Sequence, residues 1–194
     1  MPWTDLVQKP AMGSINSGLT SPSNAFLTEL FGKPRKSFTS DCQPIENTEY
    51  AKFIATVQIG NFRATGNKAF LDLVAQGFAE MYSKEPSLWN AMGSAGCLCC
   101  RLVRGSQTSI SDHSWGTAID FTISGQLDTR GDNLTQKGLA RVYDFLYPKG
   151  IFWGAGFSTT EDAMHFALSK EKALEMALAG IWGANVKLRA QMID

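Results

Sequence analysis

Two short stretches in the second half of the chain alternate apolar with small or polar residues, and this period of two predicts β-strands. The first stretch, 117–123, reads Thr-Ala-Ile-Asp-Phe-Thr-Ile, and its β-branched and aromatic residues favour a strand over a helix. Ile119, Phe121 and Ile123 are then expected to face the core. Asp120 lies on the opposite face, between an alanine and a threonine.

The second stretch, 163–168, follows the same pattern. Met164, Phe166 and Leu168 form an apolar face, while His165 lies on the other face between two alanines. Each strand thus carries one side chain that can bind a metal ion, with small neighbours on either side. This arrangement leaves room for an ion and a substrate.

Helical spacing of apolar residues predicts amphipathic helices over 66–82 and 135–147, the second with Thr135 as its N-cap. Shorter helices are expected at 21–30, with Pro22 in the first turn, and at 87–92 and 171–179. Further strands are expected at 53–59, at 98–103 and from 152 onward, with a polar loop at 125–133. Helices followed by strands that carry polar residues indicate an α+β fold with an antiparallel sheet.

The 194 residues fit one domain, because no internal repeat and no long linker divides them. Residues 1–45 are expected to be a loop-rich extension with one short helix, belonging to the same domain as 46–194. The 18 basic and 18 acidic residues cancel and form no block of one sign. This balance argues against a nucleic-acid partner or an anionic membrane held by bulk charge. A monomer is expected.

Only two histidines occur in the chain, His113 and His165, and both lie in motifs with carboxylates. Imidazole together with carboxylate suits zinc and related transition metals. His113 and Asp120 are seven residues apart, so one unbroken strand would place them on opposite faces. Gly116 is the natural position for a turn or bulge that returns His113 to the Asp120 side.

The predicted metal cluster is therefore His113, Asp120 and His165, which together hold one zinc ion. Three protein ligands leave a fourth position for water, as in catalytic zinc sites, and zinc lowers the pKa of such a water to about 7. Asp162, three residues before His165, is the expected general base. A plain turn-capping role for Asp162 is the alternative.

The sequence around the first histidine has the form Ser-x-His-x-x-Gly-x-Ala-x-Asp, from Ser111 to Asp120, and the second motif is Asp-x-x-His. This pattern resembles the zinc D-alanyl-D-alanine carboxypeptidases, a family that includes the L-alanyl-D-glutamate endopeptidases of phage endolysins. The resemblance implies a hedgehog/DD-peptidase-like fold, the three zinc ligands named above, and Asp162 as catalytic acid/base. Ala167 departs from the family, because relatives often carry glutamate there.

The resemblance also implies an arginine upstream of the first histidine that steadies the substrate. Arg101 and Arg104 both lie in that region, and on a strand they would face opposite sides. We prefer Arg101 for the catalytic role and retain Arg104 as a substrate-binding residue, with a structural role as the alternative for either one. Ser111 is expected to help orient the substrate. Trp153 is expected to line the cleft unless it belongs to the core.

The sequence thus predicts a zinc metallopeptidase that hydrolyses cell-wall peptides, either as a carboxypeptidase or as an endopeptidase. A catalytically silent zinc-binding module of the same fold is the main alternative. A mononuclear iron oxygenase is the second, although its usual His-x-Asp spacing is absent here. Residues 1–18 lack the form of a Sec signal, and no stretch approaches the roughly 20 apolar residues of a membrane span. We therefore expect synthesis in the cytoplasm and action on the wall after lysis or non-classical export.

Three of the four cysteines form a Cys-x-Cys-Cys cluster, Cys97, Cys99 and Cys100, while Cys42 lies far upstream. The paired clusters typical of structural zinc are absent from the sequence. In an oxidising compartment Cys42 could bridge to one of the three. The sequence selects neither the partner nor the redox state.

Overall fold

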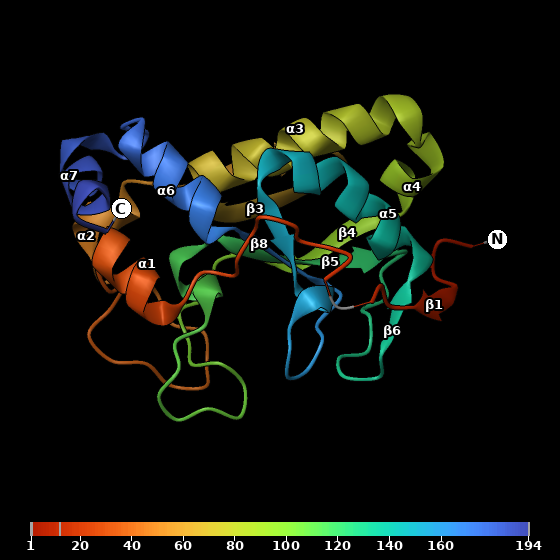
Figure 1. The fold of residues 1–194 in the computed structure, drawn as a ribbon, viewed down its shortest axis with the longest axis horizontal. Coiled ribbons are helices and arrows are strands. Elements are labelled where there is room, and N and C mark those ends of the chain that lie inside the picture. Colours follow the sequence, from red (N-terminus) through yellow and green to blue (C-terminus); the bar gives the residue numbers. More distant parts are fainter. Residues whose placement is uncertain (1, 12, 194) are drawn as a thin grey trace.

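The computed structural model describes residues 2–11 and 13–193, and a four-stranded antiparallel sheet lies at its centre (Figure 1). The strand order is β4-β5-β8-β7. The strands are β4 (Met92–Gly96), β5 (Ala118–Ile123), β7 (Ile151–Trp153) and β8 (His165–Leu168). The two strands predicted from their alternating pattern, β5 and β8, are therefore neighbours in the middle of the sheet.

Two smaller antiparallel pairs accompany this sheet. One is the hairpin of β2 (Ile54–Ile59) and β3 (Phe62–Asn67), and the other pairs β1 (Leu6–Gln8) with β6 (Leu134–Gln136). The second pair corrects a prediction, because Thr135 pairs with Val7 in a strand and is not a helix N-cap. Residues 134–136 instead pair with the N-terminal segment, so the helix begins only at Lys137. No local sequence pattern indicates this pairing.

Seven α-helices are seen in the described residues. They are α1 (Asn24–Phe31), α2 (Thr48–Ala51), α3 (Lys68–Lys84), α4 (Pro86–Ala91), α5 (Lys137–Leu146), α6 (Lys170–Leu178) and α7 (Gly183–Ile193). Helix α1 begins later than predicted, because the Ser23 side chain accepts a hydrogen bond from the Phe26 amide and forms the N-cap, which leaves Pro22 outside. Helix α7 was not predicted, since its apolar residues follow no clear stripe.

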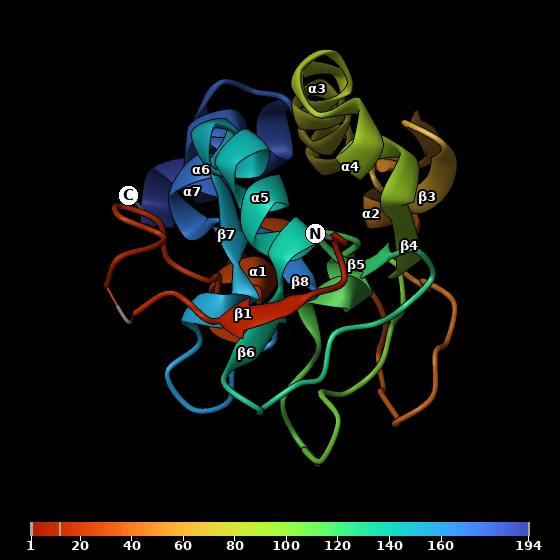
Figure 2. The same ribbon diagram turned by 90° about the vertical axis from the view of Figure 1, so that its right-hand side faces the viewer.

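The helices α3, α5 and α6 cover one side of the central sheet, and the longest loops project on the other side (Figures 1 and 2). Ile119, Phe121 and Ile123 are fully buried, as the alternation predicted. The ring centroid of Phe121 lies 5.4 Å from that of Phe78 on α3 and 5.2 Å from that of Phe166 on β8. Mixed helices and antiparallel strands around this core confirm the α+β class.

The N-terminal segment is hydrogen-bonded to the edge of the central sheet through one buried residue, Asn16. Its side-chain amide donates to the Trp153 carbonyl and its side-chain oxygen accepts from the Trp153 amide, both at 2.9 Å. The Asn16 side chain thus replaces a neighbouring strand at β7 and satisfies backbone groups that would otherwise lie buried and unpaired. Within the described residues, no helix combines the length and apolar character needed to cross a membrane.

Candidate metal centre

The sheet register brings two of the predicted ligands together. Asp120 on β5 lies directly opposite His165 on β8, so their side chains share one face of the sheet. Asp120 Oδ1 is 3.1 Å from His165 Nδ1. This is the face away from the buried isoleucines and phenylalanine of β5, as the alternating pattern required.

His113 reaches the same place from a short 3-10 helix, Asp112–Trp115, which ends at Gly116. Gly116 has φ 61°, and a Cβ there would lie 2.8 Å from the Gly66 Cα and the Asn67 nitrogen. Only glycine suits both this left-handed backbone and this close approach to β3. The predicted turn at Gly116 is therefore present, and it returns His113 to the Asp120 side.

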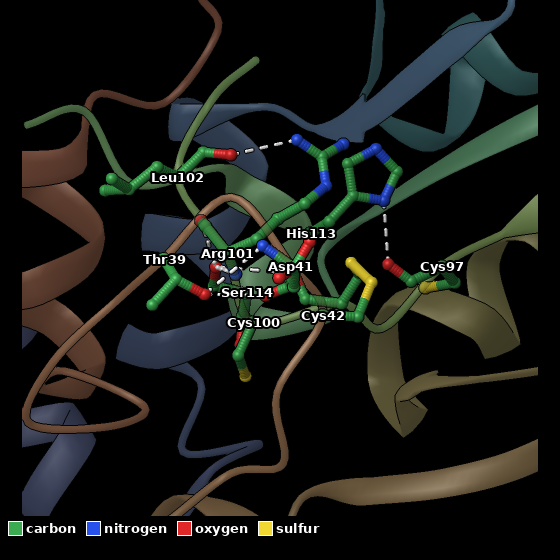
Figure 3. The surroundings of a disulfide bond; sticks show 10 residues. Thr39, Asp41, Cys42, Cys97, Cys100, Arg101, Leu102, His113 and Ser114 are labelled. Carbon is green, nitrogen blue, oxygen red and sulfur yellow. Dashed lines mark hydrogen bonds between the residues drawn. A yellow bond between two sulfur atoms is a disulfide. The ribbon is translucent and has the colours of Figure 1, made fainter. Parts of the chain in front are cut away.

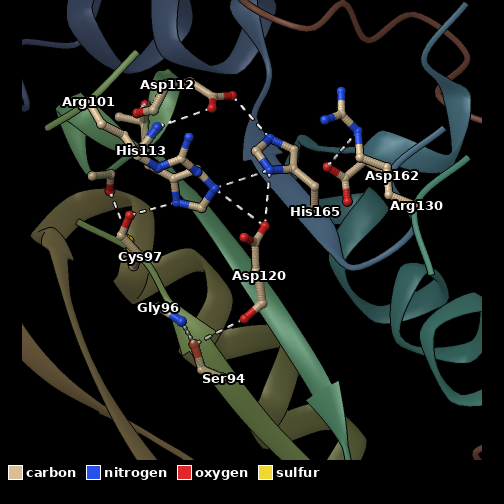
Figure 4. A network of polar contacts seen from close by, with 12 residues as sticks. Ser94, Gly96, Cys97, Arg101, Asp112, His113, Asp120, Arg130, Asp162 and His165 are labelled. Atoms are coloured by element: carbon tan, nitrogen blue, oxygen red, sulfur yellow. Dashed lines mark hydrogen bonds and ion pairs between the residues drawn. The ribbon is translucent and has the colours of Figure 1, made fainter. Parts of the chain in front are cut away.

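The three donor atoms form a nearly equilateral triangle (Figure 4). His113 Nε2 lies 3.3 Å from Asp120 Oδ1 and 3.3 Å from His165 Nδ1, which completes the 3.1 Å contact between the other two. Zinc bonded at about 2.0–2.1 Å in a tetrahedron separates its ligand atoms by about 3.3 Å. The residues present thus fit one face of a zinc tetrahedron, with the fourth corner left for another ligand.

The second nitrogen of each histidine ring also has a partner. His113 Nδ1 lies 2.7 Å from the Cys97 carbonyl oxygen, and His165 Nε2 lies 3.1 Å from Asp112 Oδ2. Metal-binding histidines almost always donate their other ring N–H to such a carbonyl or carboxylate. Because these contacts occupy the outer nitrogens, His113 Nε2 and His165 Nδ1 are the nitrogens that would bind a cation.

Asp112 was not predicted as part of the site, although it lies between two motif residues. Asp112, His113 and His165 form a second group of potential ligands, whose donor atoms lie within 4.8 Å of one another. The structure therefore offers two donor sets that share both histidines, and the set with Asp120 has the shorter separations. No pattern in the sequence distinguishes this aspartate from an ordinary polar residue.

The charges of the site favour a cation. Burial would raise the pKa of Asp120, but hydrogen bonds from the two histidines outweigh it and hold that pKa below its usual range. Burial would lower the pKa of His165, but the Asp112 and Asp120 carboxylates outweigh it and raise that pKa well above its ordinary value. Both carboxylates thus stay ionised beside the histidines, and a cation bound here would take the place of the proton that the raised pKa of His165 retains.

Asp162, the predicted base, lies in the turn that leads into β8, where its carbonyl accepts from the His165 amide at 3.1 Å. Its Oδ2 is 3.6 Å from Arg130 Nε, and its buried Oδ1 has no hydrogen-bond partner within the described part of the chain. Burial raises the pKa of Asp162, and the nearby charge of Asp120 adds to the effect. A desolvated carboxylate with one free oxygen beside the metal centre is suited to accept a proton.

Arg130 is a further site residue that sequence reasoning missed. It belongs to the predicted polar loop between β5 and β6, and its guanidinium faces the Asp162 carboxylate (Figure 4). A single arginine in a loop carries no periodic signal, and only the folding of that loop toward the 154–163 segment places it here. The pairing gives the general-base candidate a cationic neighbour.

The two predicted arginines occupy different environments. Arg101 is half-buried beside His113, and its guanidinium donates to the Leu102 carbonyl at 3.0 Å (Figure 3). Burial lowers the pKa of Arg101, and the charge of Arg104 contributes. Arg104 lies exposed in a turn. The predicted strand at 98–103 is wrong, because only isolated bridges form there.

Ser111 and Trp153, which were also predicted to contact the substrate, are both buried, but in different surroundings. Ser111 is buried at the start of the 3-10 helix, and its amide donates to the Arg101 carbonyl at 3.0 Å. Trp153 is fully buried, stacked on Phe166, and its indole N–H donates to the Ala163 carbonyl at 2.7 Å. The placement of Trp153 along the cleft is therefore corrected, because its only polar atom is used inside the core.

The cysteines resolve into one disulfide and two thiols. Cys42 is bonded to Cys99 (Figure 3), while Cys97 and Cys100 are free and buried. Burial raises the pKa of Cys97, and it raises that of Cys100 to about 11, so both stay protonated at neutral pH. The disulfide joins the segment before α2 to the loop that carries Arg101.

Comparison with known families gives one match. Residues 104–168, about a third of the chain, match the family model described as D-alanyl-D-alanine carboxypeptidase. The resemblance to the zinc DD-peptidase family is thereby confirmed, on the segment that contains the predicted metal ligands and Asp162. Neither the curated proteins nor the solved structures give a match.

Proposed function

We propose that this protein is a zinc metallopeptidase that hydrolyses peptides of the peptidoglycan type. The observation that carries the proposal is the triangle of His113 Nε2, Asp120 Oδ1 and His165 Nδ1, with sides of 3.1–3.3 Å. The family match over the same segment supports the peptidase class and the wall-peptide substrate. In this proposal the three residues hold one zinc ion. When bound, zinc supplies Lewis-acid polarisation of the scissile carbonyl and makes a water molecule more acidic.

Asp162 supplies the proton transfers. Its unpaired Oδ1 accepts a proton from the attacking water as the new carbon–oxygen bond forms. The carboxyl then returns that proton to the leaving amine as the carbon–nitrogen bond breaks, so Asp162 ends in its starting state. Its raised pKa suits both halves of this exchange, because an ordinary aspartate would return the proton less readily.

The surrounding loops orient the substrate in this proposal. Arg101 and Ser111 lie on the His113 side of the centre, and Arg130 lies on the Asp162 side. A guanidinium on either side can bind a substrate carbonyl or carboxylate. We assign the substrate carbonyl to Arg101, because it is half-buried beside His113 (Figure 3), whereas Arg104 is exposed in a turn.

The proposal extends to the fold and to the domain boundaries. An antiparallel sheet that carries two ligands in register supports a hedgehog/DD-peptidase-like fold. Hydrogen bonds between Asn16 and Trp153, and the pairing of β1 with β6, support one domain that includes residues 1–45 with 46–194. Ala167 occupies the position of a family glutamate, and both D-Ala-D-Ala and L-Ala-D-Glu bonds stay open as substrates.

The test combines metal content with peptide hydrolysis. Wild type, His113→Ala and Asp162→Asn are assayed on wall peptides, with products identified by mass spectrometry. We expect zinc-dependent cleavage by wild type and loss of both zinc and activity in His113→Ala. Asp162→Asn is expected to keep its zinc while kcat falls by about 10²–10⁴. Asp72→Asn, the same change on the remote helix α3, serves as the control and is expected to act as wild type.

The product masses would identify the bond and so decide between carboxypeptidase and endopeptidase. A zinc-loaded wild type that cleaves nothing across a broad peptide panel would overturn the peptidase in favour of a silent zinc-binding module. Activity of Asp162→Asn equal to wild type would remove this residue from the mechanism. Stoichiometric iron with 2-oxoglutarate turnover would instead favour the oxygenase.

A further inference from the structure

We propose that Asp112 is a positioning residue that fixes the ring of His165 and presents its Nδ1 to the metal, without binding the metal itself. This inference rests on the proposed zinc centre. Asp112 occupies the unspecified position of Ser-x-His, so the motif assigns it no role. The geometry of its two carboxylate oxygens gives it one.

Both oxygens of Asp112 are already engaged by the two histidines. Oδ1 accepts a hydrogen bond from the His113 backbone amide at 3.1 Å, and Oδ2 lies 3.1 Å from His165 Nε2. The Asp112 side chain is only 16 % exposed, so water does not compete strongly for these contacts. The carboxylate therefore links the segment that carries one ligand to the strand that carries another.

Asp112 and Asp120 approach opposite nitrogens of the same His165 ring. Asp120 lies at Nδ1, where His113 Nε2 also lies, whereas Asp112 lies at Nε2. The two nitrogens of an imidazole point in divergent directions, so one ion cannot bind at both. An ion in the tighter triangle uses Nδ1, and Nε2 must then carry a proton that Asp112 accepts.

The charge of Asp112 strengthens this assignment. A carboxylate that accepts the outer N–H of a ligand histidine makes the ring a better donor and holds its orientation. The Cys97 carbonyl performs the equivalent task for His113, at 2.7 Å. The two ligand histidines thus differ in a testable way. A substitution at Asp112 removes the acceptor of His165, whereas no side-chain substitution removes the Cys97 backbone carbonyl that serves His113.

Zinc affinity of the full-length protein is the first measurement, made by competition with a chromophoric chelator and without any peptide. Asp112→Ala is expected to bind zinc about 10–100-fold more weakly than wild type, the usual effect of losing such a partner. Asp112→Asn keeps a neutral acceptor of the same shape and is expected to lose less. Asp120→Asn removes a ligand and is expected to lose more than either. Asp72→Asn on α3 is the control and should bind as wild type.

Two spectroscopic readouts separate positioning from ligation. With cobalt in place of zinc, the visible spectrum of Asp112→Ala should keep the wild-type band pattern, while Asp120→Asn changes it. In the NMR spectrum of the zinc form, the His165 Nε2 proton should become fast-exchanging in Asp112→Ala. The His113 Nδ1 proton, held by a backbone carbonyl, should stay as in wild type and serve as the internal reference.

Wild-type affinity in both Asp112 variants would overturn the inference, as would a cobalt spectrum altered to the same extent as in Asp120→Asn. If Asp112→Ala does not fold, Asp112→Asn carries the same measurements. The readouts need no catalysis. A wild type that binds zinc but cleaves no wall peptide would therefore overturn the peptidase and leave the Asp112 test intact.

Discussion

The proposed metal ligands and the proposed catalytic and substrate-binding residues of this protein are held in different ways. The proposed ligands lie on two central strands and a short 3-10 helix, and the outer ring nitrogen of each histidine has a hydrogen-bond partner. The proposed catalytic and substrate residues lie on three loops: 97–111, 124–133 and 154–163. There Asp162 has an unpaired buried oxygen, and the Arg130 side chain is 44 % exposed.

This difference follows from what each of the two groups of residues must do. A metal ion selects a fixed set of distances, so its ligands gain from rigid elements that prepare the geometry before binding. A peptide substrate brings its own hydrogen-bonding groups and differs in shape along its length, so the loops that meet it must adjust. We call the first group the metal half and the second group the substrate half.

The largest expected effect comes from breaking the metal half at Gly116. Gly116→Ala places a Cβ 2.8 Å from backbone atoms of β3 and strains a left-handed residue, so we expect a loss of about 2–5 kcal/mol in unfolding free energy. Zinc affinity should fall with it, because His113 lies three residues away on the helix that ends there. Denaturant unfolding and chelator competition measure the two quantities.

Gly125→Ala is the matched control for that substitution. Gly125 also has positive φ, at 76°, but a Cβ there meets nothing within 4 Å. It should cost only the strain, about 1–2 kcal/mol, and leave zinc affinity unchanged. Equal costs at the two positions would show that the approach of Gly116 to β3 is not a constraint on the site.

A second experiment removes the disulfide from the substrate half. Replacing Cys42 and Cys99 by serine opens a bridge across 57 residues and should cost about 2–4 kcal/mol of unfolding free energy. Because the bridge holds the Arg101 loop, kcat/KM should fall while zinc affinity changes by less than about tenfold. The single variant Cys42→Ser should behave like the double one. A large loss of zinc affinity would mean that the two halves are not separable.

The features of the metal half could be predicted from the sequence more fully than those of the substrate half. Period-two alternation in 117–123 and 163–168 predicted which face of each strand carries Asp120 and His165, because one buried face imposes that pattern. The turn at Gly116 was predictable, because the odd spacing between His113 and Asp120 requires a turn between them. Glycine is the residue that most readily adopts the left-handed backbone of such a turn. These features are local or periodic, and such features can be recognised in one chain.

Contacts between distant segments could not be predicted. The pairing of β1 with β6 replaced a helix start at Thr135, and the expected strand at 98–103 is a loop held by the 39–43 segment. The choice of Cys99 as the disulfide partner depends on that same pairing. The roles of Asp112 and Arg130 depend on loop conformations for which a single sequence carries no periodic signal.

The third experiment compares the two arginines of the substrate half. Arg101→Ala should lower kcat/KM about a hundredfold, the typical effect of losing one positioned donor, while zinc affinity stays as in wild type. Arg104→Ala, at an exposed turn, should lower it severalfold at most. Steady-state kinetics on the identified wall peptide measure both. The reverse order would transfer the substrate role to Arg104 and separate Arg101 from the chemistry.

The smallest expected effect is a shift in the pH profile caused by Arg130. Burial raises the pKa of Asp162 above its ordinary value, and the charge of Arg130 opposes that rise. In the proposed mechanism Asp162 accepts a proton only when it is ionised, so activity should fall as the pH drops through this pKa. Arg130→Met removes the opposing charge and should raise the Asp162 pKa further. The acidic limb of kcat/KM should therefore move to higher pH, by less than about one unit because the pair is partly exposed.

Salt provides the control for this shift. Ions screen an exposed pair, so the difference between Arg130→Met and wild type should shrink as ionic strength rises. Arg63→Met, on the exposed hairpin strand β3, should leave the profile unchanged at every salt concentration. An acidic limb that moves to lower pH in Arg130→Met, or does not move at all, would show that Asp162 is not the group that titrates. The base would then have to be sought elsewhere in the substrate half, with the metal half unaffected.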